Sequence, residues 1–154
     1  MKLFLECKPD EVLAQVAGVP SRVIVHSPGR GNVSKLLSKN SGAMGLVDED
    51  PMSAEARTLS KFAEVSAAYG VRLKCNKARN NRLVVLCPKL EDWVIETAKA
   101  AKMKMDDRRF NLSENPRDLH ADINFRLPNL ERLLKDLLQA KSPRLLHLKS
   151  LLSG

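Results

Sequence analysis

The sequence predicts an α/β fold in which a mainly parallel sheet is flanked by helices and followed by a helical extension. Short apolar runs of strand length alternate with segments of helical periodicity. The segments between the first runs are long enough to be crossover helices. Gly and Pro punctuate several of the boundaries. Strands that are separated by helices pair in parallel and are covered on both faces.

The predicted elements follow the order strand, helix, strand, helix, strand, helix, strand, strand, helix. The predicted strands lie at residues 2–5, 22–26, 43–47, 71–75 and 82–86. The predicted helices lie at residues 9–17, 33–38, 54–69 and 90–101. Pro9 suits the first turn of the first helix, and the two acids that follow it favour the positive end of the helix dipole. Ser53 is a typical cap for the third helix, and Gly18 and Gly70 stop the first and the third.

The last third of the chain is predicted to be a helical extension. Residues 104–127 are mixed in charge, and we expect them to be irregular. Beyond Pro128 leucines recur at helical spacing, and a further leucine-rich turn follows Pro143. This stripe either covers the core or binds a partner, and we expect the former because exposed leucine stripes are rare on monomers. The predicted domains are an α/β domain at 1–101 and a C-terminal part at 102–154 that packs on it.

The chain is strongly basic. Its 26 Lys and Arg exceed its 18 Asp and Glu, so its 154 residues carry a formal net charge of +8. Such an excess favours a phosphate-rich partner, because Lys and Arg release counterions from nucleic acid; a protein that is merely basic is the alternative. Only 4% of the residues are aromatic, so recognition through rows of stacked rings is not expected. Cations that could line a track for a nucleic-acid backbone, or equally be solvated surface charges, are Lys8, Lys35, Lys39, Lys74, Lys77, Arg79 and Arg82.

The cysteines and the N-terminal residues predict a reduced, cytoplasmic protein. The three cysteines show no C-x-x-C spacing, so neither a zinc ribbon nor a redox pair is indicated. An acid at residue 6 comes too early for the apolar region of a signal peptide. No apolar run approaches membrane-spanning length, and we expect no association with a membrane.

Acidic residues follow two of the predicted strands. Glu6 comes directly after the first apolar run, and Asp48 and Asp50 come after the third. Side chains two residues apart on an extended backbone point the same way. Carboxylates gathered beyond the carboxyl ends of neighbouring strands are typical of a Mg²⁺ or Mn²⁺ site. A plain strand-to-helix turn also explains Asp-x-Asp, whereas Glu6, where burial is expected, needs a compensating partner.

Two further segments are predicted to reach the same edge of the sheet. The loop at 27–32 has a flexible backbone before a helix, so it could present N–H groups and a guanidinium to a phosphate, although it is not a Walker loop. Glu91 and Asp92 open a later helix, where the helix dipole alone explains acids, but at least one is a candidate metal ligand. The candidate phosphate-binding residues are Lys8, Gly29, Arg30, Gly31 and Asn32.

Over about residues 1–101 the sequence resembles the Toprim domain, the metal-binding module of topoisomerases, bacterial primases and nucleases of the overcoming-lysogenization-defect type. A Toprim domain begins with a strand that ends in Glu before a helix, as at residues 3–10, and a later strand ends in Asp-x-Asp, as at 47–50. The Gly-Arg-Gly-Asn turn is similar to one in the nuclease branch, and Leu90-Glu91 is similar to a pair in stand-alone members. The chain departs from the family at Cys7, where members usually have Gly.

The resemblance implies a Toprim or Rossmann-like sheet and a nuclease-like, metal-dependent phosphodiester hydrolase acting on DNA or RNA. Asp48, Asp50 and Glu6 would be catalytic and hold one or two Mg²⁺ or Mn²⁺ ions, with Glu91 or Asp92 completing the set. Glu6 would be the general acid or base, and the basic loop would hold the scissile phosphate. Toprim nucleases often act beside an ATPase, and this chain has no nucleotide-binding loop, so an ATPase is an expected partner.

Two other functions are compatible with these residues. The chain could keep the fold without the chemistry and bind nucleic acid or a protein partner, in which case neither divalent metal nor Asp48 would matter for binding. It could instead be a phosphotransferase or phosphatase of small molecules that uses the same carboxylates. That reading leaves the net charge of +8 unexplained.

Overall fold

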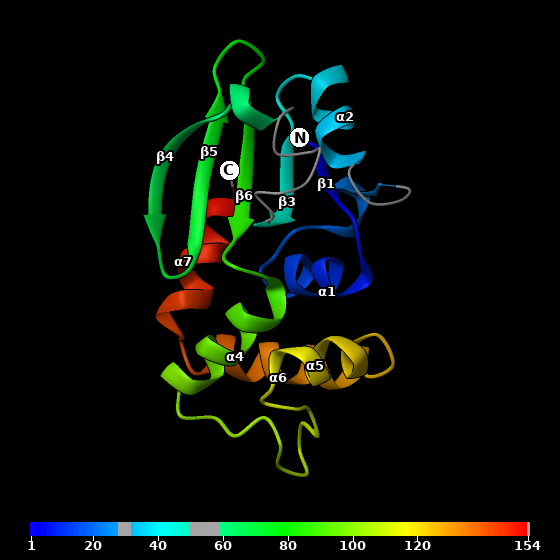
Figure 1. Cartoon of the computed structure of the whole chain (residues 1–154), viewed down its shortest axis with the longest axis vertical. Helices are drawn as coiled ribbons and strands as arrows, with labels where there is room; N and C mark the ends of the chain where they lie inside the picture. The colour runs from blue at the N-terminus through cyan, green and yellow to red at the C-terminus, as the bar shows by residue number, and fades with distance from the viewer. Residues whose placement is uncertain (28–31, 50–58, 154) are drawn as a thin grey trace.

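Six strands form one mixed sheet in the computed structural model, which describes residues 1–27, 32–49 and 59–153 (Figure 1). The strands are β1 (Leu3–Leu5), β2 (Ile24–His26), β3 (Met44–Asp48), β4 (Ala63–Ala68), β5 (Val71–Asn76) and β6 (Asn81–Leu86). Their spatial order is β2-β1-β3-β6-β5-β4. The four strands β2, β1, β3 and β6 are parallel to one another, while β5 and β4 are antiparallel. The predicted α/β class with a mostly parallel sheet is therefore confirmed.

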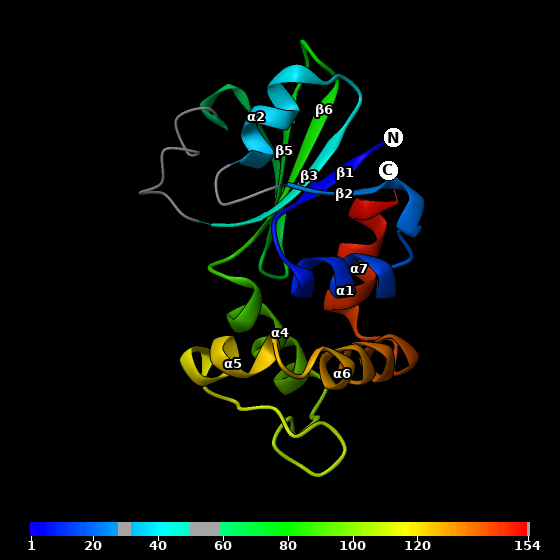
Figure 2. The ribbon, with the colours of Figure 1, turned by 90° about the vertical axis from the view of Figure 1, so that its right-hand side faces the viewer.

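Helices cover both faces of this sheet. They are α1 (Lys8–Val16), α2 (Asn32–Lys39), α4 (Leu90–Ala100), α5 (Pro116–Ile123), α6 (Leu127–Gln139) and α7 (Pro143–Leu152), with short 3₁₀ turns at Ser21–Val23 and Leu59–Lys61. Figure 2 shows α2 on one side of the sheet and α1 and α7 on the other. None of the described helices is both long and apolar enough to cross a membrane.

The two faces of the sheet bury separate clusters because successive strand residues point to opposite faces. Leu3 and Leu5 of β1 join the larger cluster with α1, α4, α6 and α7, whereas Phe4 between them joins the smaller one with α2. Gly45 lets α2 lie close to β3: a Cβ there would come within 2.9 Å of a Val33 methyl group. A small residue at this position of β3 is therefore a packing requirement.

The prediction of a helix over 54–69 is wrong in the part that the structure describes. After the 3₁₀ turn at Leu59–Lys61 the chain forms β4, which pairs with β5 through a tight turn at Tyr69 and Gly70. Both turn residues have positive φ, 54° and 72°, as a two-residue hairpin of type I′ requires. The alanines and Glu64 of this segment favour a helix locally, but the hydrogen-bonded edge of β5 overrides that preference.

A helix was also missed in the stretch predicted to be irregular. The Asn115 side chain accepts hydrogen bonds from the N–H groups of Arg117 and Asp118, and Pro116 occupies the first turn of α5. This is a regular helix start, since Asn is a favoured cap and Pro needs no N–H donor there. Leu119 and Ile123, four residues apart, bury the inner face of the helix.

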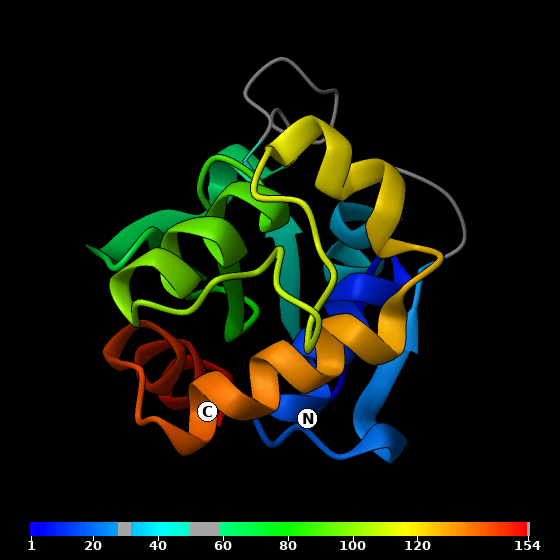
Figure 3. The ribbon, with the colours of Figure 1, turned by 90° about the horizontal axis from the view of Figure 1, so that it is seen from below.

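The leucine stripe of α6 lies within the larger core cluster. Leu130, Leu133, Leu134 and Leu137 are fully buried together with Leu3 and the inner face of α1. Figure 3, which looks from below, shows α6 crossing beneath α1, and the two helices are in contact. The stripe is thus occupied by the protein's own core, while the division of the chain at residue 101 stays a prediction.

Candidate functional site

The carboxyl ends of the four parallel strands meet at one edge of the sheet. Leu5 pairs with His26 of β2, and Asp48 pairs with Leu86 of β6. Glu6 follows β1 directly, so the structure brings it to the same edge as Asp48. Asp50, the other predicted carboxylate of this strand end, lies outside the described residues.

Asp48 is held at the N-terminus of α4. Its Oδ1 accepts a hydrogen bond of 3.0 Å from the backbone N–H of Leu90. Loss of hydration and the negative charges of Glu91 and Glu6 together raise the pKa of Asp48 to about 6. The residue as a whole is nonetheless exposed. One carboxylate oxygen is thus bonded to the helix, while partial loss of hydration and the neighbouring acids make the carboxyl group a weaker acid than usual.

Asp10 joins this edge although the sequence interpretation gave it no role beyond the helix dipole. It is 5% exposed, on the buried face of α1 with Leu13 and Ala14. Burial raises its pKa to about 7, with further contributions from the charges of Asp48 and Glu6. It accepts hydrogen bonds from the thiol and the backbone N–H of Cys7. Its place at the helical spacing of Leu13 and Ala14 is the signal that could have found it.

Glu91 is the member of the Glu91–Asp92 pair that approaches Asp48. It is 7% exposed, and its Oε1 lies 2.8 Å from Nδ1 of His120 on α5. Asp92 is half-buried, and no contact with the other carboxylates is observed for it among the described residues. We define the carboxyl-edge cluster as Glu6, Asp10, Asp48 and Glu91; Glu6 directly follows β1, and the other three belong to α1, β3 and α4.

The chemistry of this cluster suits a hard divalent cation. Carboxylate oxygens are the ligands that Mg²⁺ and Mn²⁺ prefer, and a cation would offset both the burial and the repulsion that raise the pKa values of Asp10 and Asp48. Within the part of the chain that the structure describes, however, no three His, Cys, Asp or Glu side chains are arranged to hold a metal ion. The cluster fits a metal in charge and donor type, without a complete set of ligands among these residues.

The predicted phosphate-binding loop falls mostly outside the described residues. Gly29, Arg30 and Gly31 lie there, and Asn32 is the first residue of α2. The chain enters the loop from Ser27, which is buried and whose Oγ has no hydrogen-bond partner among the described residues. The prediction that this loop holds a phosphate therefore stays a prediction.

Lys8 takes part in a separate charged group at the same edge. Its Nζ lies 3.4 Å from Oε2 of Glu11, and the same oxygen contacts Nε2 of His26. The hydrogen bond from His26 is the main cause that lowers the pKa of Glu11. The Lys8 side chain remains 67% exposed, so its charge is available to solvent beside the cluster.

No protein-family model, curated protein or solved structure matches the chain. The Toprim resemblance therefore rests on the motifs alone.

Proposed function

We propose that this chain is a Mg²⁺- or Mn²⁺-dependent phosphodiester hydrolase of Toprim-like type that acts on DNA or RNA. The observation that supports this most is the carboxyl-edge cluster itself, where burial and the charges of neighbouring acids raise the pKa values of Asp10 and Asp48 toward neutrality. Perturbed carboxylates gathered at the carboxyl edge of a parallel sheet are typical of functional sites. The net charge of +8 on the whole chain suits a polyanionic substrate.

Asp48 and Glu6 would hold the metal, with Asp50 beyond the described residues and Glu91 as further ligands. A bound divalent cation activates water and neutralises charge on the phosphoryl group in such reactions. The Leu90 N–H holds one oxygen of Asp48 and so orients the other. Asp10, whose pKa is about 7, can keep or release a proton beside the site near neutral pH. An ATPase partner stays part of this proposal.

A second candidate is a nucleic-acid or partner-binding module that has the fold without the chemistry. The absence of a three-residue ligand set among the described residues favours it. In that case the carboxyl-edge cluster would remain as a structural feature of the fold, and the basic surface would carry the binding.

Calorimetric titration with Mn²⁺ at about pH 8, above the pKa values of Asp10 and Asp48, together with cleavage of labelled DNA and RNA, separates the two candidates. Asp48→Asn is the informative variant, because its amide oxygen can still accept the Leu90 hydrogen bond. We expect it to abolish Mn²⁺ binding and to slow cleavage at least about a hundredfold.

Asp106→Asn is the matched control, since Asp106 is exposed and lies in the segment between α4 and α5, which contributes no residue to the carboxyl-edge cluster. It removes the same charge and should change neither Mn²⁺ binding nor cleavage. If the wild-type chain binds no Mn²⁺, the hydrolase proposal is wrong and the binding module takes its place.

A further inference from the structure

A cavity of about 280 Å³ lies between α2 and the hairpin that joins β5 to β6. Its walls come from three segments that are far apart in the sequence, and they include Leu37, Ser38, Lys61, Phe62, Asn76 and Arg79. The hairpin leads into the amino end of β6, where Arg82 pairs with Met44. The cavity therefore lies toward the opposite end of the parallel strands from the carboxyl-edge cluster.

The walls of the cavity are joined by a buried amide. Asn81 is 1% exposed, and its Nδ2 donates to the carbonyl oxygens of Leu37 and Asn40 at 2.8 and 2.9 Å. Its Oδ1 accepts a hydrogen bond of 2.9 Å from the N–H of Ala43. One side chain thus ties the end of α2 to the hairpin and to the start of β3. The cavity is pre-formed, which lowers the entropy cost of binding.

Among the described residues, the lining is cationic. Lys61 and Arg79 are both on its wall, and none of the described lining residues is Asp or Glu. Neither cation forms an ion pair with a carboxylate in the described parts of the chain. The side-chain oxygen Oδ1 of Asn76 already accepts a hydrogen bond from the backbone N–H of Ala78, so the side-chain amide can serve a ligand only as a donor. Two cations and an amide donor around a concave surface are suited to a phosphate group.

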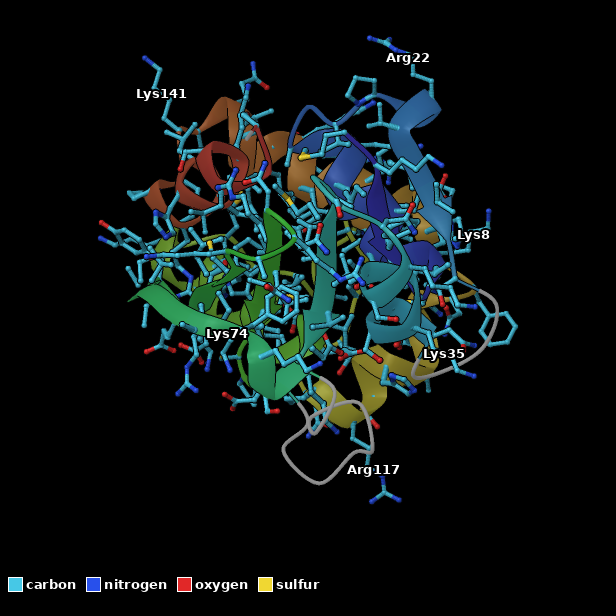
Figure 4. All side chains as sticks on the ribbon, turned by 90° about the horizontal axis from the view of Figure 1, so that it is seen from above. Lys8, Arg22, Lys35, Lys74, Arg117 and Lys141 are labelled. Carbon is cyan, nitrogen blue, oxygen red and sulfur yellow. The ribbon has the colours of Figure 1, made fainter. Side chains whose placement is uncertain are left out.

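The surface around the cavity is basic as well. Figure 4, which looks down on this end of the molecule, shows Lys35 beside α2 and Lys74 beside the β4–β5 pair. We define the hairpin end as seven cations of α2, the turn before β4 and the part of the β5–β6 hairpin away from the carboxyl edge, namely Lys35, Lys39, Lys61, Lys74, Lys77, Arg79 and Arg82. Arg72, on β5 opposite Val85 and nearer the carboxyl edge, is not among them and pairs with Glu49 and Glu64. No ion pair involving any of the seven is found among the described residues.

We propose that this cavity binds a backbone phosphate of the nucleic-acid strand and so holds the strand at the hairpin end. Lys61 and Arg79 contact the phosphate, and the apolar wall of Leu37 and Phe62 accommodates the adjoining sugar or base. β6, whose six residues separate the two ends of the sheet, spans about 17 Å, so a short strand can reach both. This inference rests on the proposed function for its substrate class, but its test needs no cleavage.

The test is the binding of a fluorescent thymidine oligomer of about 15 nucleotides, followed by anisotropy in EDTA, so that no metal-dependent cleavage occurs. The cavity variant Lys61→Gln/Arg79→Gln should raise Kd at least about tenfold. The control Lys35→Gln/Lys77→Gln removes the same charge from the hairpin end outside the cavity and should raise Kd less than about threefold. Ser38→Phe, which fills the cavity without changing charge, should weaken binding as the cavity variant does.

If the cavity variant and the control weaken oligomer binding equally, and Ser38→Phe has no effect, then the oligomer is attracted by the overall positive charge of the surface and not by the cavity. That result would overturn the proposal. Circular dichroism confirms that each variant is folded, and Ser38→Ala repeats the change at that position without filling the cavity. Competition by unlabelled thymidine monophosphate identifies the source of the phosphate. Equal competition by the mononucleotide and the oligomer, per phosphate, would assign the cavity to a free nucleotide and overturn its strand-holding role.

The two proposals fail in different ways. If the wild type does not bind Mn²⁺ but the cavity variant still binds the oligomer more weakly, the hydrolase proposal is wrong and the proposed phosphate site stands. If Mn²⁺-dependent cleavage requires Asp48 but the cavity variant binds the oligomer as the wild type does, the phosphate site is wrong and the hydrolase stands.

Discussion

The two ends of the parallel strands carry opposite charges and differ in how far their charged side chains are buried. At the carboxyl edge, acids from β1, α1, β3 and α4 are crowded together, and two of them, Asp10 and Glu91, are buried. At the hairpin end seven cations stand on α2 and the neighbouring strands, without ion pairs to the described carboxylates. One sheet thus separates a region suited to holding a cation from a region suited to holding a polyanion.

The difference in burial has an energetic consequence. Ionising a buried carboxylate beside other carboxylates costs free energy that the exposed cations of the hairpin end do not incur. We therefore expect stability to depend on the carboxyl edge and on pH, whereas binding strength depends on the hairpin end and on salt. The following four predictions test this division, from the largest expected effect to the smallest.

Replacing Asp10 with Asn should stabilise the protein at high pH. The folded-state pKa is raised from 3.8 to about 7, so between these values the unfolded chain releases a proton that the folded chain keeps. This contribution of Asp10 to stability therefore falls as pH rises through that window. Relative to wild type, Asp10→Asn should gain about 2 to 4 kcal/mol in free energy of unfolding between about pH 4 and pH 8, measured by urea denaturation.

The exposed control Asp106→Asn should keep its stability difference from the wild type within about 0.5 kcal/mol over the same range. If the free energies of unfolding of Asp10→Asn and the wild type change in parallel with pH, Asp10 titrates as an ordinary exposed acid. In that case burial of acids at the carboxyl edge would not make stability depend on pH.

Asn81→Ala should destabilise the hairpin end. It removes three hydrogen bonds and leaves the carbonyl oxygens of Leu37 and Asn40 without their buried donor. We expect a loss of about 2 to 3 kcal/mol in free energy of unfolding, together with weaker binding of the oligomer. Lys77→Ala, on the exposed turn of the same hairpin, should cost less than about 0.5 kcal/mol. Equal costs for the two variants would mean that Asn81 does not join α2 to the hairpin.

His120→Ala should have a smaller effect, at the carboxyl edge. Glu91 is buried and loses the group that lies 2.8 Å from its Oε1, so we expect a loss of about 1 kcal/mol in free energy of unfolding. A double-mutant cycle with Glu91→Gln isolates the pair, and Arg117→Ala on the outer face of α5 is the control. A coupling energy near zero would mean that His120 of α5 does not stabilise Glu91 in the carboxyl-edge cluster.

The smallest effect is expected for a single cation outside the cavity. Lys39→Gln should reduce the slope of log Kd against log salt concentration by about one, with little change in stability. Lys104→Gln, in the segment after α4 and away from the hairpin end, should leave the slope unchanged. The same reduction for both variants would mean that nucleic acid binds without preference for the hairpin end.

The strands that are buried could be predicted well from the sequence. The apolar runs that became β1, β3 and β6 were placed to within one or two residues, because strands that are almost fully buried must be nearly continuously apolar. β5, in which buried Val71 and Leu73 alternate with the less buried Arg72 and Lys74, was placed as closely. β2 was predicted two residues too long at its start, where a 3₁₀ turn at Ser21–Val23 precedes it. β4 was predicted as helix, since it is mostly exposed and lacks that signal.

Part of the candidate site could also be predicted from the sequence. Glu6 and Asp48 stand at strand ends, and the ends of parallel strands must share one edge, so their proximity follows from the strand assignment. Asp10 was not found, because an acid in the first turn of a helix has an ordinary explanation in the helix dipole. Only its burial against Asp48 distinguishes it from such a cap.

The sequence by itself determined the α/β class, the buried strands, the basic surplus and the acids at two strand ends. These properties depend on neighbouring residues or on composition, so they can be read along the chain. Only the tertiary structure decided that β4 pairs with β5, that Glu91 meets Asp48, and that α2 and a hairpin enclose a cationic cavity. Each of these depends on the packing of segments far apart in the sequence, which local periodicity does not specify.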